Sequence, residues 1–314
     1  MQLPRYAFFN GKIVPYADAR VGVLTHALNY GTGCFAGLRG YWNSEEKQLF
    51  VFRPRDHFRR FLESARLLAM ELPFTEDDLV EHALELVRRE DLKTDSYIRP
   101  LAFLSDETLG VRLHDLTPAV SMVAFPFGKY MENDEAHLTF SAWLRIHDGM
   151  IPARGKITGG YVNSALARTA AQKAGFDDAL LLNKNGHVSE ASVSNFFMVR
   201  HGEVITPAIT DDILEGITRR TLIGLLRDEM GLKVIERSID RTEVYLAEEA
   251  FLAGTGVQIV PVTRIDHRRI GSGSAGRIGL DLKRLYDEIV RGRIEKYRSW
   301  CRPVYAAQPA PVRA

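Results

Sequence analysis

The stretch RGKITGGYVNSALA, residues 154–167, places one lysine, Lys156, among glycines and follows it with a tyrosine and an alanine-rich run. The glycines permit backbone angles that other residues avoid, and the pattern after them predicts a helix over 162–174. Most lysines are solvated surface charges. A lysine between a strand and a helix has instead the geometry of a site, because burial lowers the pKa of an amine and makes it a nucleophile.

The length and composition of the chain limit its class. Its 314 residues exceed the usual size of a single core, which predicts two domains, or one core with a large appendage. Hydrophobic residues make up 46% and charged residues 26%, which is typical of a globular protein and argues against wholesale disorder. The net charge of +1 provides no field that would attract nucleic acid or an anionic membrane.

The chain carries little that would direct it to a membrane or an oxidising compartment. Its first residues, MQLPRYAFFNGKIVPY, lack the basic and long apolar segments of a signal peptide or anchor. No window holds 18 uninterrupted apolar residues. Cys34 and Cys301 are too few for a disulfide framework or a tetrahedral metal site. We therefore expect a cytoplasmic protein without a metal ion.

Strands and two helices are expected over residues 1–125, which we interpret as a small N-terminal domain. The pair Asn10-Gly11 between apolar runs predicts a hairpin, and Thr75 with Asp78 resembles a capping box. Further strands are expected at 48–54, 96–104 and 119–127, and helices at 56–72 and 73–90. Strands, then helices, then strands predict an α+β unit.

The polar, turn-rich segment 126–138 is the predicted linker, and residues 139–314 form the predicted large C-terminal domain. In that domain we expect strands at 179–183, 232–237, 249–254 and 259–265, and a hairpin within 195–207. We expect helices at 162–174 and 216–231, and one long amphipathic helix over 279–300. The chain has no internal repeat.

Several other stretches could form parts of a binding site. GITRR (216–220) begins a predicted helix, whose free first-turn amides and Thr218 hydroxyl suit an anion, although a plain helix start is the commoner meaning. GTG (254–256) exposes amides at the end of an apolar strand, as a simple tight turn also would. Arg60 lies on a predicted helix, where most arginines are solvated.

Glu190, in GHVSEASVSNFF (186–197), ends a predicted strand among small residues. An acid there is commonly an exposed edge residue. If it shares a pocket with Lys156, however, the two side chains can flank a ring. A lysine that forms a Schiff base, anion cradles and a carboxylate beside a ring nitrogen are the components of a pyridoxal phosphate site.

Together these blocks resemble the class IV pyridoxal-phosphate aminotransferases, and specifically the branched-chain amino acid aminotransferase family. The resemblance runs from about Tyr6 to about Tyr286. It is carried by HALNYGTGCFAGLRGY (26–41), VFRPRDHFRRFLESA (51–65), SYIRPLAF (96–103), GKITGGYVNS (155–164), GHVSEASVSNFF (186–197), LEGITRRTL (214–222) and GTGVQIVPV (254–262). It implies fold type IV, with a small N-terminal α/β domain, a larger barrel-like C-terminal α/β domain and the cofactor between them.

The resemblance also implies roles for the residues that match the family's cofactor site. Lys156 would form the Schiff base with the cofactor and move the proton between substrate Cα and cofactor C4′. Tyr161 would contact the phenolic oxygen, and Glu190 would hold the ring nitrogen protonated. Leu214 would pack on the ring. The phosphate would be bound by Arg60, Ile217, Thr218 and Thr255.

The family's substrate pocket accepts an aliphatic side chain and then the distal carboxylate of glutamate or 2-oxoglutarate. By resemblance, aromatic side chains would surround the aliphatic group, and Arg99 would bind the distal carboxylate. The backbone amides of Gly256 and Val257 would bind the α-carboxylate. The remaining matching positions are Tyr30, Phe35, Gly37, Tyr97, Phe127 and Tyr130. The loop at 109–113 would complete the pocket of a neighbouring subunit, which implies at least a homodimer.

The chain departs from the family pattern at four places, all of which concern substrate range. Residues 254–257 read GTGV where bacterial members often have Gly-Thr-Ala-Ala, and Phe127 takes a tryptophan position. The loop after 109 carries Arg112 and His114, and SEASVSN (189–195) replaces the commoner SEGxxxN.

The implied reaction is reversible amino transfer from L-leucine, L-isoleucine or L-valine to 2-oxoglutarate, as part of branched-chain amino acid biosynthesis. Three alternatives share the fold: a D-amino-acid aminotransferase, an (R)-amine transaminase and an aminodeoxychorismate lyase. A non-catalytic protein that retains the fold is a further alternative, which the retained lysine and anion cradle argue against.

Overall fold

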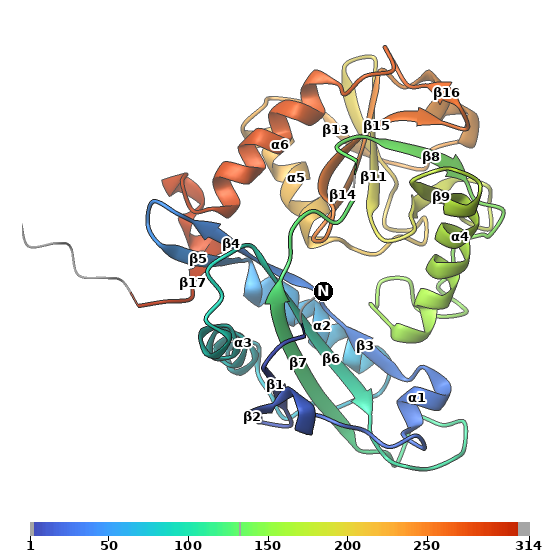
Figure 1. The fold of residues 1–314 in the computed structure, drawn as a ribbon. Coiled ribbons are helices and arrows are strands. Elements are labelled where there is room, and N and C mark those ends of the chain that lie inside the picture. Colours follow the sequence, from blue (N-terminus) through green and yellow to red (C-terminus); the bar gives the residue numbers. More distant parts are fainter. Residues whose placement is uncertain (1–2, 132, 307–314) are drawn as a thin grey trace, which may run out of the picture.

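The computed structural model describes residues 3–131 and 133–306. It has two lobes, each built on one sheet, and the chain crosses from one to the other after residue 126 (Figure 1). The first lobe carries helices α2 and α3, and the second carries α4, α5 and α6 (Figure 1). No helix among the described residues is both long and apolar enough to cross a membrane.

The first sheet is antiparallel throughout, in the order β17-β5-β4-β6-β7-β1-β2, with β3 paired to β6. Its strands are β1 (Tyr6–Phe9), β2 (Lys12–Pro15), β3 (Gly33–Phe35), β4 (Leu38–Asn43), β5 (Gln48–Phe52), β6 (Ser96–Leu104), β7 (Pro118–Pro126) and β17 (Cys301–Pro303). The hairpin predicted at Asn10-Gly11 is confirmed. Both turn residues have positive φ, at 45° and 87°, as tight hairpin turns require.

Two helices cover this sheet, α2 (Pro54–Leu67) and α3 (Glu76–Glu90), and a short helix α1 (His26–Tyr30) precedes β3. The capping box predicted at α3 is confirmed, because Thr75 Oγ1 accepts from Asp78 N at 3.2 Å and Thr75 N donates to Asp78 Oδ2 at 2.8 Å. The apolar faces of α2 and α3 bury Phe58, Phe61 and Leu79 against the sheet. This packing fixes the face of α2 that carries Arg60.

The second sheet is mixed, in the order β10-β9-β8-β15-β14-β11-β12-β13, with β16 paired to β15. Its strands are β8 (Ala136–Phe140), β9 (Asp178–Leu182), β10 (Val188–Ala191), β11 (Asn195–Arg200), β12 (Glu203–Thr206), β13 (Val234–Glu236), β14 (Glu249–Gly254), β15 (Gln258–Ile265) and β16 (Arg268–Arg269). Its helices are α4 (Tyr161–Lys173), α5 (Ile217–Asp228) and α6 (Arg277–Val290). In Figure 1, α5 and α6 lie on the left of this sheet and α4 on the right.

One core cluster joins the two lobes. It combines Phe50 and Phe52 of the first sheet with Leu222 of α5 and Leu282 of α6. Short 3-10 helices fill the connections, at Tyr16–Asp18 (η1), Thr158–Gly160 (η2), Arg241–Leu246 (η3) and Glu295–Trp300 (η4). The lobes therefore share buried apolar surface, which holds them at a fixed separation around whatever lies between them.

The predicted closing helix over 279–300 is wrong as a single element. Helix α6 ends at Val290, Gly292 takes a left-handed φ of 71°, and the chain resumes as η4. Strand β17 then pairs with β5 in the first sheet, with Cys301 opposite Phe52. Gly292 stops the helix because left-handed backbone is accessible to glycine and ends the α-helical hydrogen bonding.

The domain ranges 1–125, 126–138 and 139–314 stay a prediction. Strand β8 begins at Ala136, inside the predicted linker, and β17 belongs to the first sheet although it follows the second lobe in sequence. Residue 132 of that linker and residues 307–314 of the last range lie outside the described residues.

Candidate active site

A cavity of about 230 Å³ is lined by residues of both lobes. Every residue predicted to contact the cofactor lines it: Arg60, Lys156, Tyr161, Glu190, Leu214, Ile217, Thr218 and Thr255. Of the predicted substrate residues, these also line it: Phe35, Gly37, Tyr97, Arg99, Tyr130, Gly256 and Val257. Strands of both sheets, helix α2, the starts of α4 and α5 and the turn between β14 and β15 thus bring together residues far apart in sequence.

Lys156 is fixed by its backbone as well as its side chain. Its N–H donates to Ser64 Oγ at 3.1 Å and its carbonyl accepts from Phe35 N at 2.9 Å, which ties the loop before η2 to the first lobe. Its Nζ donates to the hydroxyl of Tyr161 at 2.6 Å. The amine and the first residue of α4 therefore face the same part of the cavity.

The glycines beside Lys156 have a different use from the one predicted. Gly155 and Gly159 do not adopt left-handed backbone angles. A Cβ on Gly155 would lie 2.8 Å from Leu67 Cδ1, and Gly159 packs directly against the backbone of Gly31. These glycines thus allow close approach of the lysine loop to the first lobe, rather than unusual dihedral angles.

The surroundings of Lys156 favour its neutral form. Burial lowers its pKa well below the ordinary lysine value, the positive charge of Arg60 lowers it further, and the carboxylate of Glu190 opposes the shift. A neutral amine carries a free electron pair. The surroundings therefore favour the nucleophilic form of Lys156.

Glu190 is 5% exposed on β10, so the exposed edge residue considered above is ruled out. Its carboxylate pairs with Arg145 Nη2 at 2.8 Å and accepts from Asn195 Nδ2 at 2.9 Å and Leu214 N at 3.2 Å. Burial raises its pKa, which Arg145 and the Leu214 amide counteract. The carboxylate is thus fixed in position and supplied with donors.

Arg145 and Asn195 were missed by the sequence analysis, although both line the cavity. Asn195 lies inside the matching block 186–197 and could have been found there. Arg145 had no local signal, because it comes from the loop after β8 and meets Glu190 only in the folded chain.

The start of α5 is suited to an anion. Its N-cap, Gly216, has no side chain that could cap the helix. The first-turn amides of Ile217 and Thr218 therefore face the cavity without a side-chain acceptor. Arg60 is held beside this helix start by a bond from Nη1 to Glu215 O at 3.1 Å. The Ser194 hydroxyl, also on the lining, is buried without a hydrogen-bond partner among the described residues.

These groups fit pyridoxal phosphate. The helix start and Arg60 suit its phosphate, Glu190 suits a protonated ring nitrogen, and Lys156 suits its aldehyde carbon. The orphaned Ser194 hydroxyl supplies a further donor of the kind that an anion would satisfy.

The remaining wall is aromatic and carries one cation. The guanidinium of Arg99 lies 4.6 Å from the ring centroid of Phe35 and 5.2 Å from that of Tyr97, and it donates to the Tyr97 hydroxyl at 3.4 Å. A side chain at Gly37 would overlap the Tyr97 hydroxyl, so glycine is required there. This wall can accept an aliphatic group or, through Arg99, a carboxylate.

Tyr30 and Phe127 do not line the cavity. Tyr30 is 37% exposed, and its hydroxyl accepts from Gly110 N at 3.2 Å, beside the loop 109–113. Phe127 packs on Tyr97, with ring centroids 5.1 Å apart, one layer behind the wall.

Comparison with known proteins places this geometry in a family. The model of the amino-transferase class IV family matches residues 34–265. The "Probable branched-chain-amino-acid aminotransferase" of Aquifex aeolicus is 44% identical over 301 residues, covering 96% of this chain and 97% of that protein.

Solved structures agree in fold over nearly the full length. The branched-chain aminotransferase of Thermoproteus uzoniensis, crystallised with norvaline, has a TM-score of 0.92 at 40% identity, with 96% of this chain and 100% of that chain covered. The branched-chain amino acid aminotransferase of Thermobaculum terrenum, in its PLP form, has a TM-score of 0.93 at 40% identity, with coverages of 98% and 100%. The predicted fold class and family are confirmed: the chain belongs to the class IV aminotransferases.

Proposed function

We propose that this protein is a pyridoxal-phosphate-dependent branched-chain amino acid aminotransferase. It transfers the amino group of L-leucine, L-isoleucine or L-valine to 2-oxoglutarate, reversibly, and acts in the cytoplasm. The observation that carries the proposal is the Lys156 amine, whose pKa is lowered by burial, in one cavity with the buried carboxylate of Glu190. The relatives' names, at 44% identity and below, support the substrate class.

Bound pyridoxal phosphate supplies an electron sink for the bonds at the substrate Cα. Lys156 Nζ would attach to the aldehyde carbon of the cofactor and, once released, would move the proton between substrate Cα and cofactor C4′. Tyr161, which accepts from Nζ at 2.6 Å, orients that amine and contacts the phenolic oxygen. Glu190 would hold the proton on the ring nitrogen, and Leu214 would pack on the ring face.

The phosphate would be held by Arg60, by the amides of Ile217 and Thr218, and by the side chains of Thr218 and Thr255, all of which line the cavity. On the substrate side, Phe35, Tyr97 and Tyr130 enclose the aliphatic group, and Arg99 binds the distal carboxylate of glutamate. Gly37 makes room for Tyr97, and Phe127 supports it from behind. The amides of Gly256 and Val257 bind the α-carboxylate.

The active form is proposed to be a homodimer. Tyr30 and the loop 109–113 lie outside the cavity of their own chain and are exposed, which suits a role in the partner's pocket. Exposed apolar side chains in and near that loop support an interface there.

The test is a transamination assay on purified holoenzyme. L-leucine with 2-oxoglutarate is expected to give L-glutamate, whereas D-alanine and (R)-1-phenylethylamine are expected to react at least about a hundredfold more slowly. Lys156→Ala should abolish turnover, and Lys173→Ala, at the far exposed end of α4, should not. Faster reaction of D-alanine or the amine, or turnover by Lys156→Ala, would contradict the proposal.

A further inference from the structure

Arg39, on β4, is a buried guanidinium held by backbone carbonyls. Its side chain donates to Gly256 O at 3.1 Å, Phe127 O at 3.1 Å and Gly128 O at 2.9 Å, and the residue is 3% exposed. No carboxylate within the described ranges forms an ion pair with it, and its Nε has no acceptor there. The guanidinium also lies 5.4 Å from the ring centroid of Tyr41 and 5.2 Å from that of Phe127. A buried cation that faces carbonyl dipoles and aromatic rings but no carboxylate retains a positive potential.

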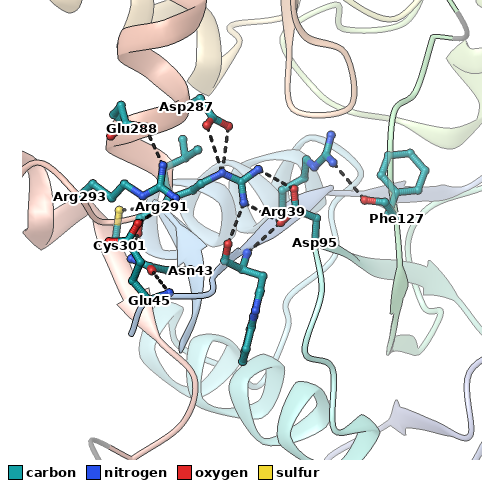
Figure 2. A network of polar contacts seen from close by, with 12 residues as sticks. Arg39, Asn43, Glu45, Asp95, Phe127, Asp287, Glu288, Arg291, Arg293 and Cys301 are labelled. Atoms are coloured by element: carbon teal, nitrogen blue, oxygen red, sulfur yellow. Dashed lines mark hydrogen bonds and ion pairs between the residues drawn. The ribbon is translucent and has the colours of Figure 1, made fainter. Parts of the chain in front are cut away.

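These bonds connect three segments around the cavity. They join the first sheet to the connection at 127–128 and to the turn 255–257 between β14 and β15. Figure 2 shows the side chain of Arg39 reaching the carbonyl of Phe127. Arg39 thus lies behind the turn whose other side lines the cavity.

The connection is also held from its opposite side. Phe127 N donates to Asp95 O at 2.9 Å, and the Asp95 carboxylate pairs with Arg291 through two contacts of 3.0 Å (Figure 2). Asp95 Oδ1 also accepts from Trp42 N at 2.8 Å. The peptide groups around Phe127 therefore have fixed orientations, and Arg39 is presented to the turn by a rigid frame.

The bond to Gly256 O has a consequence for the next amide. A trans peptide group is planar, so its C=O and N–H point in opposite directions. Because the Gly256 carbonyl points to Arg39, the N–H of Val257 points away from Arg39. That N–H has no acceptor among the described residues, and Val257 lines the cavity.

We infer that Arg39 is a positioning residue for the substrate α-carboxylate. It fixes the Gly256–Val257 peptide with its N–H towards the cavity, and its charge polarises that peptide, which makes the N–H a stronger donor to an anion. The inference rests on the proposed function and adds to it a buried cation that acts on the carboxylate without touching it.

The probe is 4-methylpentanoate, which has the leucine skeleton and carboxylate but no amine. Its dissociation constant is measured by calorimetry on holoenzyme saturated with cofactor, and cofactor affinity is measured separately by titrating the apoprotein. Arg39→Met should weaken 4-methylpentanoate binding by about tenfold or more, the loss expected for a charge-assisted hydrogen bond, and leave cofactor affinity within about twofold.

Arg39→Lys retains the charge but not the planar set of donors, so it should recover part of the lost affinity. It also keeps the inference testable if Arg39→Met does not fold. The matched control is Arg219→Met, since Arg219 is also buried, at 4% exposure, and donates to a backbone carbonyl, that of Pro207. This control should leave 4-methylpentanoate binding unchanged.

Unchanged 4-methylpentanoate binding in Arg39→Met would overturn the inference. Equal losses of ligand and cofactor affinity would also overturn it, because they would indicate a purely structural role. Neither outcome affects the proposed function, which fails instead if the wild-type holoenzyme neither binds 4-methylpentanoate nor converts L-leucine.

Discussion

The candidate site holds an amine and a carboxylate in surroundings that oppose both charges. Burial lowers the pKa of Lys156 and raises that of Glu190, so each group is displaced towards its neutral form. Of the two groups, only the carboxylate has an oppositely charged side chain within hydrogen-bond distance, that of Arg145 at 2.8 Å. The two groups can therefore take different protonation states at the same pH: a neutral amine and an ionised acid.

Arg145 is the group that most opposes the rise in the pKa of Glu190 caused by burial, and its removal should change the pH profile. In Arg145→Met the burial of Glu190 remains while its ion pair is lost, so its pKa rises further. The acid limb of kcat/KM should move to higher pH, and activity at pH 7 should fall about tenfold or more, with partial recovery towards about pH 9. The measurement is kcat/KM for L-leucine between about pH 6 and 9.

Arg200→Met is the control, because Arg200 also pairs with a glutamate, Glu243 at 2.9 Å, but does not line the cavity. Its acid limb should match that of the wild type. If the acid limb of Arg145→Met were not shifted, Glu190 would not depend on the Arg145 cation for its ionisation.

Lys156 should also influence the stability of the apoprotein. Since its pKa is lower in the folded state, the unfolded state binds more protons between the folded value and the ordinary lysine value of about 10.4. In this range the contribution of Lys156 to the free energy of unfolding rises with pH. At pH 7 its burial therefore costs stability, by about 1.4 kcal/mol for each unit by which the pKa is lowered.

Lys156→Met removes this cost, so the variant apoprotein should be more stable than wild type at pH 7, and the difference should shrink by about pH 10. Urea unfolding at the two pH values, followed by far-UV circular dichroism, measures it. If the difference in stability between Lys156→Met and wild type grew with pH, the lowered pKa of Lys156 would be contradicted.

At the scale of elements, the junction between β11 and α5 depends on one glycine. A Cβ on Gly216 would overlap the side-chain oxygen of Asn195, the residue that donates both to Glu190 and to Leu214 O. Gly216→Ala should therefore displace Asn195, destabilise the protein by about 1–3 kcal/mol and weaken cofactor binding about tenfold. Thermal unfolding and cofactor titration measure the two effects.

Gly224→Ala provides the comparison within the same helix. A Cβ at Gly224 has no neighbour closer than 3.9 Å, and alanine is the better helix former by up to about 1 kcal/mol. This variant should be as stable as wild type or more so, with unchanged cofactor affinity. If Gly216→Ala behaved in the same way, the junction would not depend on that glycine.

Local features of the fold could be predicted from the sequence. The Asn10-Gly11 hairpin and the Thr75 capping box depend on residues within a few positions of each other, and both are present. The break of the last helix at Gly292 and the pairing of β17 with β5 depend on partners far along the chain. Periodicity within one window contains no information about such partners.

The same distinction applies to the site. The matching blocks contained every residue predicted to contact the cofactor, and all of these line one cavity. Arg145 was missed because its only signal is its ion pair with Glu190. Arg39 lies inside the matching block 26–41, but nothing local shows its role, because its partners are backbone carbonyls from two distant segments. Carbonyl acceptors leave no trace in a sequence, since every residue provides one.

At the scale of the whole molecule, the first lobe exposes apolar side chains in the segment just before α1 and in the loop after β6. Val23 is 80% exposed and Val111 89%. The two segments are joined, because His26 Nε2 lies 2.9 Å from Gly110 O and Thr25 forms a bridge with Glu107. A single apolar face of this kind is suited to association with a second copy of the chain.

We therefore expect the wild-type protein to run as a dimer or larger assembly in sedimentation experiments. The double substitution Val23→Glu and Val111→Glu should shift the protein towards monomer and reduce its activity, because two negative charges without partners would be buried in the interface. Leu246→Glu, at an apolar position 63% exposed on η3, should change neither. A monomeric, fully active wild-type protein would contradict the proposed dimer.

The pairing of β17 with β5 also sets an order of events during synthesis. A chain made from its N-terminus completes β5 long before Cys301–Pro303 leaves the ribosome. Until then the nascent first sheet has an open edge along Gln48–Phe52, a strand whose residues are all buried in the finished protein. An open apolar edge can pair with the wrong strand. The first lobe can therefore complete its sheet only after the second lobe has been translated. In that interval the nascent chain most needs protection by chaperones.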